Sequence, residues 1–402
     1  MRAAAASPPI GMGRMLGFAA VGLLLVEVMF LAQGLRRHVW LADAAGAPLC
    51  RDFSVFWASG RLAGQGLASR AYDWPTVQGL MLAAGQAPGC TMPMFYPPSF
   101  LLWLTPLGWA PYAWAAGAWV AASLLAYLGA VRLATPQPRL ILFALAAPAT
   151  VACLAVGQNG LLTAALAVAG LALLDRRPIL AGLLLGALAY KPQFGVLLPV
   201  ALVAAGRWKT IAAATASVLL GMVAAGLAFG WSTWPLFLQA IQGAGEQIVQ
   251  AGALEDYKQQ SVHALAHALG AGPAAAWAWQ GAATLAAGVL VAWLWRRDGA
   301  WSCKAAGLLT AMLAASPYSG VYDFPLLAAA VVLLLSGAAR VGLGSGLCLA
   351  GAYLAPLAYG HVPVPLGPAA YALLAAAIAL QLRVSRPDGV TPGLSPRPVS
   401  AA

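Results

Sequence analysis

Long apolar runs alternate with short polar segments along most of the chain. The longest runs cover residues 15–33, 112–133, 140–156, 211–229 and 274–295. Each is continuous rather than alternating with period two, and runs of about 17–25 apolar residues have the length of a membrane-spanning helix. Backbone polar groups in hydrocarbon must bond within the chain, which leaves helices or closed barrels. The pattern therefore predicts an all-α, polytopic membrane protein.

Shorter apolar runs affect the count of spans. Residues 100–109 are too few to cross a bilayer, so they are expected to lie in the interface or to re-enter the membrane. The runs 179–190 and 194–205 flank Lys191-Pro192-Gln193 and are expected to be tilted or broken helices that meet at this turn. Together with the remaining runs, the chain is expected to form about 12 transmembrane helices (11–13).

Two longer polar stretches, residues 34–98 and 230–262, interrupt the apolar pattern. They are expected to be extracytoplasmic loops of a single membrane domain that covers residues 1–382. The first is expected to be structured and to carry a short interfacial helix near residues 67–75. The Pro-, Ser- and Gly-rich tail, residues 383–402, is expected to be disordered and cytoplasmic.

Composition supports a lipid environment. Of the 402 residues, 62% are hydrophobic and only 8% are charged, whereas about a quarter of a soluble domain is charged. The N-terminal run resembles a secretory signal, but no small-residue cleavage site precedes Arg36-Arg37 and further spans follow. We therefore interpret it as an uncleaved first helix.

The distribution of charge predicts the orientation of the helices. The formal net charge of +11 suggests nucleic acid as one partner, but no basic patch with interleaved aromatics supports this. Most Lys and Arg residues instead lie at alternate helix ends, as the positive-inside rule expects. The N- and C-termini are therefore predicted to be cytoplasmic, in the cell (inner) membrane, and the polar clusters are predicted to share the outer face.

Asp52, in the first outer loop, is the strongest catalytic candidate. A carboxylate beside Arg51 favours its charged form and can accept a proton as a general base. The alternative is an ion pair in a solvated loop. We interpret the neighbouring Phe53, Phe56 and Trp57 as anchors of this loop in the membrane interface, where aromatic residues concentrate.

Lys191 is a candidate ligand for a phosphate, because it lies at the expected turn between two short helices. The alternative is a lysine that extends from a helix end toward water. Arg51, Arg61 and Lys258 are other candidate phosphate ligands.

Further polar residues are expected on the same face, each with a simpler alternative. Asp323, after Tyr322, is either a second carboxylate of the site or a helix cap. Gln158 and Asn159 are either ligands of sugar hydroxyls or a helix terminus. Glu27 lies within the first span, where a carboxylate is costly, and it is either functional or a protonated acid bonded to a neighbouring helix.

The cysteines and histidines allow further expectations. Cys50 and Cys90 lie in the same outer loop, so we expect a disulfide between them if that compartment is oxidising. His263 and His267 share a helix face but form no convincing set of metal ligands. No metal site and no cofactor is predicted, no Asp-x-Asp motif is present, and metal dependence is left open.

Taken in order, several short motifs resemble glycosyltransferase family 87, of the GT-C superfamily. The resemblance covers about residues 15–382 and is carried by Arg51-Asp52-Phe53 with Trp57, Tyr72-Asp73, Tyr96-Pro97-Pro98, Gly157-Gln158-Asn159, Lys191-Pro192-Gln193 and Tyr322-Asp323. It implies a GT-C-like helical bundle and an inverting transfer of a hexose, with mannose as the expected sugar. The donor would be a polyprenyl-phosphate sugar, and the acceptor would be a hydroxyl of a lipid or glycan.

The resemblance also implies roles for individual residues. Asp52 matches the family's catalytic aspartate, and Lys191 lies in a stretch consistent with contact to the donor phosphate. The other substrate-binding candidates are Arg51, Gln193, Tyr96, Gln158, Asn159, Tyr322 and Asp323. The competing hypotheses are a transporter or lipid flippase, which usually has its ionisable site near the midplane, and a non-catalytic membrane scaffold.

Overall fold

The computed structural model describes residues 12–90, 92–250, 259–338, 341–359 and 361–384. These residues fold into helices, and the extended pairings among them are two isolated β-bridges, Ala42–Pro48 and Gln259–Gly320. The predicted all-α class is therefore confirmed for the described part of the chain. Most of the predicted tail, residues 385–402, lies outside it, as does Lys258.

The helices of the N-terminal half are α1 (Met12–Arg36), α2 (Asp52–Gly64), α3 (Trp74–Ala83), α4 (Pro98–Gly108), α5 (Tyr112–Ala134), α6 (Pro138–Leu145), α7 (Pro148–Val156), α8 (Gly160–Leu173), α9 (Pro178–Ala187), α10 (Pro192–Gly195) and α11 (Leu198–Ala204). Those of the C-terminal half are α12 (Trp208–Phe229), α13 (Thr233–Gln250), α14 (Val262–Ala268), α15 (Pro273–Arg296), α16 (Trp301–Ala315), α17 (Pro325–Gly337), α18 (Leu343–Leu354) and α19 (Gly367–Val384). Short 3₁₀ turns are η1 (Ala68–Tyr72), η2 (Leu188–Tyr190), η4 (Val321–Asp323) and η5 (Ala355–Ala358).

Several helices have the length and composition of membrane spans. Within the described residues, four pass both criteria: α1, α5, α12 and α15. Helices α6 and α7 together are also long and apolar enough, but they meet at a bend of 46°, where Pro148 begins the second helix. The other apolar helices of the core have 10–17 residues. The membrane character is thus supported, and the total of about 12 spans stays a prediction.

The long and short helices occupy different positions in the bundle. Only 11%, 17% and 22% of the spanning windows of α1, α12 and α15 are buried. In contrast, the shorter helices α16 and α17 are buried along most of their length. A large apolar surface on long outer helices is what a protein needs when lipid is its solvent. The short inner helices form the packed core.

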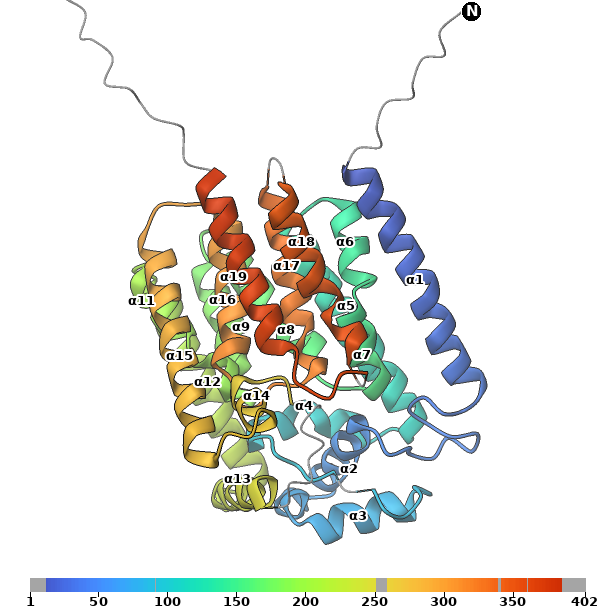
Figure 1. Cartoon of the computed structure of the whole chain (residues 1–402). Helices are drawn as coiled ribbons and strands as arrows, with labels where there is room; N and C mark the ends of the chain where they lie inside the picture. The colour runs from blue at the N-terminus through green and yellow to red at the C-terminus, as the bar shows by residue number, and fades with distance from the viewer. Residues whose placement is uncertain (1–11, 91, 251–258, 339–340, 360, 385–402) are drawn as a thin grey trace, which may run out of the picture.

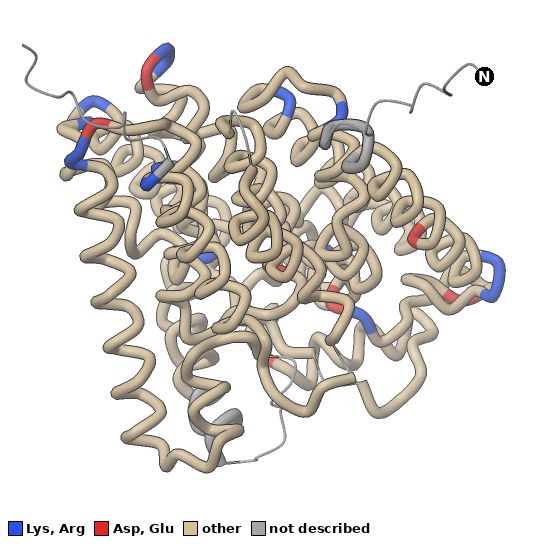
Figure 2. Tube along the Cα trace, turned by 45° about the horizontal axis from the view of Figure 1, so that its top comes forward, with Lys and Arg blue, Asp and Glu red and all other residues tan. Residues whose placement is uncertain are grey.

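The two ends of the bundle differ. The start of α1 and the end of α19 lie at one end, while α2, α3 and α13 lie at the other (Figure 1). Figure 2 shows many of the described Lys and Arg residues in the loops near the start of α1 and the end of α19. This asymmetry is of the kind that the positive-inside rule describes. Cytoplasmic termini and an extracytoplasmic site remain predictions.

The two polar stretches, predicted as extracytoplasmic loops, are largely helical. Residues 34–98 include α2, η1 and α3, and the short helix expected near residues 67–75 is η1. The stretch 230–262 contains the 18-residue helix α13. The run 100–109, expected in the interface or as a re-entrant segment, lies almost entirely in α4 (Pro98–Gly108), which packs against α2.

The aromatic residues after Asp52 are not interfacial anchors, and that prediction was wrong. Phe53 and Phe56 are fully buried, and Trp57 is 5% exposed. Phe56 packs against Phe100 and Trp119 at centroid distances of 5.5 and 5.8 Å. The physical reason is that the first polar stretch folds back onto α4 and α5, so these rings form the core beneath α2.

Candidate functional site

Helix α2 places Asp52 at its first residue. Arg51 precedes it in an extended conformation, with φ −137° and ψ 155°. Asp52 is half-buried, and a carboxylate in the first turn of a helix is favoured by the helix dipole. The buried aromatic residues that follow hold α2 against the core, so the position of Asp52 is set by packing.

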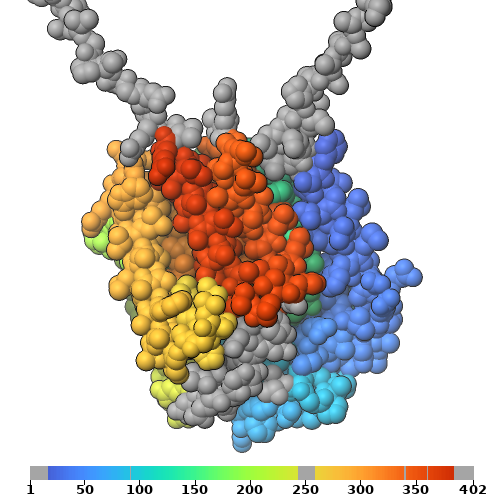
Figure 3. Space-filling view, in the orientation of Figure 1, coloured from blue at the N-terminus to red at the C-terminus, as the bar shows by residue number. Residues whose placement is uncertain are grey.

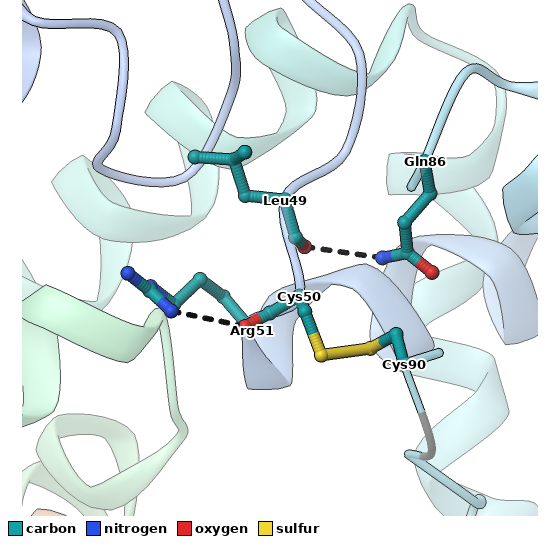
Figure 4. Close-up of a disulfide and its surroundings, with 5 residues drawn as sticks. All are labelled: Leu49, Cys50, Arg51, Gln86 and Cys90. Carbon is teal, nitrogen blue, oxygen red and sulfur yellow. Dashed lines mark hydrogen bonds between the residues drawn. A yellow bond between two sulfur atoms is a disulfide. The ribbon is translucent and has the colours of Figure 1, made fainter. Parts of the chain in front are cut away.

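A disulfide joins Cys50 to Cys90, directly before Asp52 (Figure 4). These are the two cysteines that the sequence analysis pairs, and their Cα atoms are 5.5 Å apart. Gln86 donates its Nε2–H to the carbonyl of Leu49 at 3.1 Å, as Figure 4 also shows. The start of α2 is therefore tied to the segment that follows α3.

The guanidinium of Arg51 turns back along its own loop. It donates to the carbonyl of Cys50 at 3.1 Å and to that of Val39 at 3.5 Å. Both hydrogen bonds are solvent-exposed. Arg61, another candidate phosphate ligand, instead donates to the carbonyl of Gly108 at 3.3 Å and lies over the Trp57 ring, which gives it a role in packing α2 on α4.

Lys191 and Asp323 form a buried ion pair across the bundle. The Nζ–Oδ1 distance is 2.5 Å, and the side chains are 4% and 1% exposed. The ammonium also lies 6.0, 5.4 and 5.3 Å from the ring centroids of Tyr96, Phe194 and Tyr322. A buried cation requires such compensation. The alternative of a lysine that extends toward water is therefore wrong, because Lys191 points into the protein.

Asp323 caps the 3₁₀ turn η4, and its role as a second carboxylate of the site stays a prediction. One carboxylate oxygen faces Lys191, and the other accepts from the backbone N–H of Gly320 at 3.0 Å. Gly160, at the start of α8, allows η4 to approach closely: a Cβ there would lie only 1.7 Å from the carbonyl oxygen of Tyr322. The close contact between α8 and η4 brings Asn159 and Asp323 to the same region.

Tyr96 connects the first polar stretch to the α7–α8 turn. Its hydroxyl donates to Oε1 of Gln158 at 3.0 Å, and its ring packs against Phe56 of α2 at 5.3 Å. Burial raises the pKa of Tyr96 well above its ordinary value, and the charges of Asp323 and Asp52 raise it further. Tyr96 therefore stays a neutral phenol, and both carboxylates lie within electrostatic range of it.

Asn159 is fully buried beside Tyr96. Neither its Oδ1 nor its Nδ2 meets strict hydrogen-bond geometry in the described part of the chain, but its side chain lies close enough to the Tyr96 hydroxyl to lower the pKa of that phenol slightly. The Asn159 amide is therefore directed at Tyr96. Gln158, in contrast, accepts from both Tyr96 and the backbone N–H of Asn159.

The structure thus brings together Tyr96, Gln158, Asn159, Lys191, Tyr322 and Asp323, with Asp52 within electrostatic range of Tyr96. Gln193 is half-buried on α10, and no side-chain hydrogen bond to it is found among the described residues. Arg51 lies on the exposed loop before α2.

Sequence reasoning did not identify Tyr190 as part of this region. Its hydroxyl lies 2.6 Å from that of Thr163 and 3.3 Å from the Asn159 carbonyl, and its ring stacks on Phe100 at 4.7 Å. In the sequence, its position directly before Lys191 was the one feature that could have indicated this.

Glu27, in α1, is 7% exposed, and both its oxygens lack a hydrogen-bond partner among the described residues. The bond to a neighbouring helix, one of the two alternatives for this residue, is therefore not found.

Comparison with known proteins identifies the family. The model of glycosyltransferase family 87 matches residues 95–317, more than half of the chain. The match includes Tyr96, Gln158, Asn159 and Lys191, whereas Asp52 and Asp323 lie outside it. No curated protein and no solved structure matches the chain. The chain belongs to glycosyltransferase family 87 and is a membrane glycosyltransferase.

Proposed function

We propose that the protein transfers a hexose from a polyprenyl-phosphate donor to a hydroxyl of a lipid or glycan acceptor on the extracytoplasmic face. The observation that carries this proposal is the position of Asp52. It is the first residue of a helix that a disulfide and a buried aromatic cluster hold in place. Phe56 of the same helix packs against Tyr96 at 5.3 Å, and Tyr96 contacts Gln158 and Lys191.

The proposed reaction is a single displacement. The acceptor oxygen bonds to the anomeric carbon of the hexose, and Asp52 takes the proton of that hydroxyl as a general base. The bond between the anomeric carbon and the phosphate oxygen breaks, so the lipid phosphate leaves with the electron pair. Attack opposite to the leaving group inverts the configuration at the anomeric carbon.

Arg51 and Lys191 are the proposed ligands of the donor phosphate. The exposed guanidinium of Arg51 makes only hydrogen bonds to backbone carbonyls in the described residues, and such a group can bind a phosphate in a bidentate manner. The charge of Lys191 is already balanced by the carboxylate of Asp323. Lys191 therefore attracts a second anion less strongly than an arginine without a carboxylate partner does. We therefore assign Arg51 the larger electrostatic role and Lys191 a directional hydrogen bond.

The sugar is proposed to contact the amides beside Tyr96. The buried side-chain amide of Asn159, beside the Tyr96 hydroxyl, has a carbonyl acceptor and an NH₂ donor, and Gln193 and Tyr322 are further candidates next to Lys191. Such a set suits hydroxyl groups, which both donate and accept. Mannose is the proposed hexose on the strength of the resemblance to this family.

Asp52→Asn tests the proposal. We expect loss of hexose transfer from a polyprenyl-phosphate mannose donor to membrane acceptors, by a factor of roughly 10²–10⁴, as for loss of a general base. Asp43→Asn is the matched control: Asp43 belongs to the same polar stretch, but its Oδ1 accepts from the backbone N–H groups of Ala45 and Ala47. An Asn side chain can accept the same hydrogen bonds, so this change should leave transfer unchanged.

Normal turnover by Asp52→Asn would exclude Asp52 as the base. The acceptor is identified separately, by comparing the lipids and glycans of a deletion strain with those of its parent by mass spectrometry. We expect products that lack one hexose, restored by the wild-type gene and not by Asp52→Asn. Unchanged lipids and glycans would contradict the proposed transfer.

A further inference from the structure

A groove lies between α15 and α19, near the end of the bundle where the chain termini are. It has a volume of about 220 Å³. Figure 3 shows the two helices side by side on one face of the molecule. The lining includes Leu290, Trp293, Arg297, Ile378, Leu382 and Arg383.

The lining residues belong to α15 with its C-cap Arg297 and to α19, and both helices pack against α16. A Cβ on Gly307 of α16 would come 2.6 Å from Leu294 and 3.8 Å from Ile378, so this glycine lies close to both helices. Ala375 and Ala379 of α19 keep the groove open because their side chains are short. The interior is therefore largely apolar and bounded by two helices of the membrane domain.

Two arginines stand at the ends of the helices that form the walls. Arg297 follows the last residue of α15, and Arg383 lies in the last turn of α19. The guanidinium of Arg297 stacks on Trp293 at 4.3 Å from the ring centroid. Among the described residues, neither arginine forms an ion pair with a carboxylate, so both charges are available to an external anion.

We propose that this groove binds a phospholipid with an anionic headgroup, with one acyl chain along the groove and the phosphate at Arg297 and Arg383. Basic sites between membrane helices have the charge that anionic lipids require, and Trp293 is a residue type typical of the membrane interface. A partner helix, about 10 Å across, is too wide for a groove of this volume. The candidate catalytic site lies at the opposite end of the bundle, so this lipid is neither donor nor acceptor.

The test uses the purified full-length protein in neutral detergent, with phosphatidylglycerol and phosphatidylcholine as the two probes. Bound lipid is counted by native mass spectrometry, and the dissociation constant is obtained by titration. We expect phosphatidylglycerol to bind and Arg297→Gln/Arg383→Gln to weaken that binding about 30-fold, because each juxtamembrane arginine contributes about fivefold. Phosphatidylcholine should bind weakly to both proteins.

The matched control is Arg132→Gln/Arg139→Gln. These exposed arginines lie at the end of α5 and the start of α6, away from the groove, and their removal changes the net charge by the same amount. Binding should stay within about twofold of wild type. An equal loss in this control would show that general surface charge, and not the groove, attracts the lipid.

A second variant tests the acyl-chain part of the proposal. Ala375→Phe fills the groove and leaves both arginines in place, and it should also abolish retention of phosphatidylglycerol. Wild-type affinity in Ala375→Phe or in Arg297→Gln/Arg383→Gln would overturn the proposed site. Equal affinity of the wild-type protein for phosphatidylcholine would overturn its selectivity for an anionic headgroup.

Discussion

The ammonium of Lys191 lies 2.5 Å from a carboxylate oxygen of Asp323, and both side chains are almost completely buried. Breaking such a pair by removing one partner typically costs about 3–5 kcal/mol, because the remaining charge is left in a medium of low polarity. Removing both charges costs much less. A loss of activity in Lys191→Met alone would therefore mix a folding defect with any loss of phosphate binding.

Comparison of Lys191→Met, Asp323→Asn and the double variant separates the two effects. We expect each single variant to lower the thermal unfolding midpoint and the double variant to lower it by less than the sum, with a coupling of about 2–3 kcal/mol. The measurements are thermal unfolding in detergent and steady-state transfer. If Lys191 also binds the donor, the double variant should regain stability while its KM for the donor stays raised.

A donor KM equal to that of wild type in the stable double variant would remove Lys191 from the phosphate site. Additive effects on stability would show that the ion pair does not couple the two residues. Arg51→Gln provides the comparison, since its guanidinium bonds only to exposed carbonyls in the described residues. It should raise the donor KM without a loss of stability.

Among the elements, the crossing of α2 and α4 determines where Asp52 lies. Gly60 allows this crossing: a Cβ there would come 2.1 Å from the carbonyl oxygen of Leu104. Gly108 has the same role on the facing helix, where a Cβ would lie 2.2 Å from the backbone nitrogen of Arg61. The two helices therefore pack backbone to backbone, as small residues permit at helix interfaces in membranes.

Gly60→Ala should move α2 away from α4. We expect a loss of roughly 1–3 kcal/mol in the free energy of unfolding from overpacking, and a fall in transfer rate on the order of 100-fold if Asp52 shifts by about 1 Å. Unfolding and transfer are measured on the same preparation. Gly79→Ala on α3 is the control, because nothing lies within 4 Å of its Cβ.

In a helix, an unhindered Gly→Ala change is neutral or stabilises by up to about 1 kcal/mol. Gly79→Ala should therefore keep full activity. Full activity and unchanged stability in Gly60→Ala would contradict the proposed dependence of the Asp52 position on this crossing.

For the molecule as a whole, the two ends of the helical bundle differ. The candidate site, α2 and α3 lie at one end, and the start of α1, the end of α19 and the proposed lipid groove lie at the other. Positive charge at the second end favours its retention in the cytoplasm. Asp52 would then face the compartment in which a disulfide is stable, in agreement with the Cys50–Cys90 bond.

Cysteine labelling tests this orientation. In a Cys348→Ser background, Gln65→Cys after α2 should react with a membrane-impermeant maleimide in intact cells, because Gln65 is exposed at the site end. Asp298→Cys, exposed after α15, should react only after permeabilisation. The reverse pattern would place Asp52 in the cytoplasm and contradict the proposed extracytoplasmic transfer.

Several properties could be predicted from the sequence because they depend on local pattern. Continuous apolar runs predict membrane helices at residues 112–133 and 211–229, where the structure has α5 and α12. The Cys50–Cys90 disulfide could be predicted because both cysteines lie in one polar stretch. Lys191, Gln158 and Asn159 stood out because polar residues at helix ends are rare in so apolar a chain.

Other features were decided only by the tertiary structure, because they depend on contacts between segments far apart in the chain. The Lys191–Asp323 pair joins residues separated by 132 positions, and no periodicity predicts such a partner. Residue type alone predicted a membrane-interface position for Phe53, Phe56 and Trp57. Folding of the first polar stretch onto α4 and α5 buries them instead. The groove between α15 and α19 likewise brings together residues far apart in the chain, such as Leu290 and Arg383. Residue type determined which groups prefer lipid, and packing determined which of them meet.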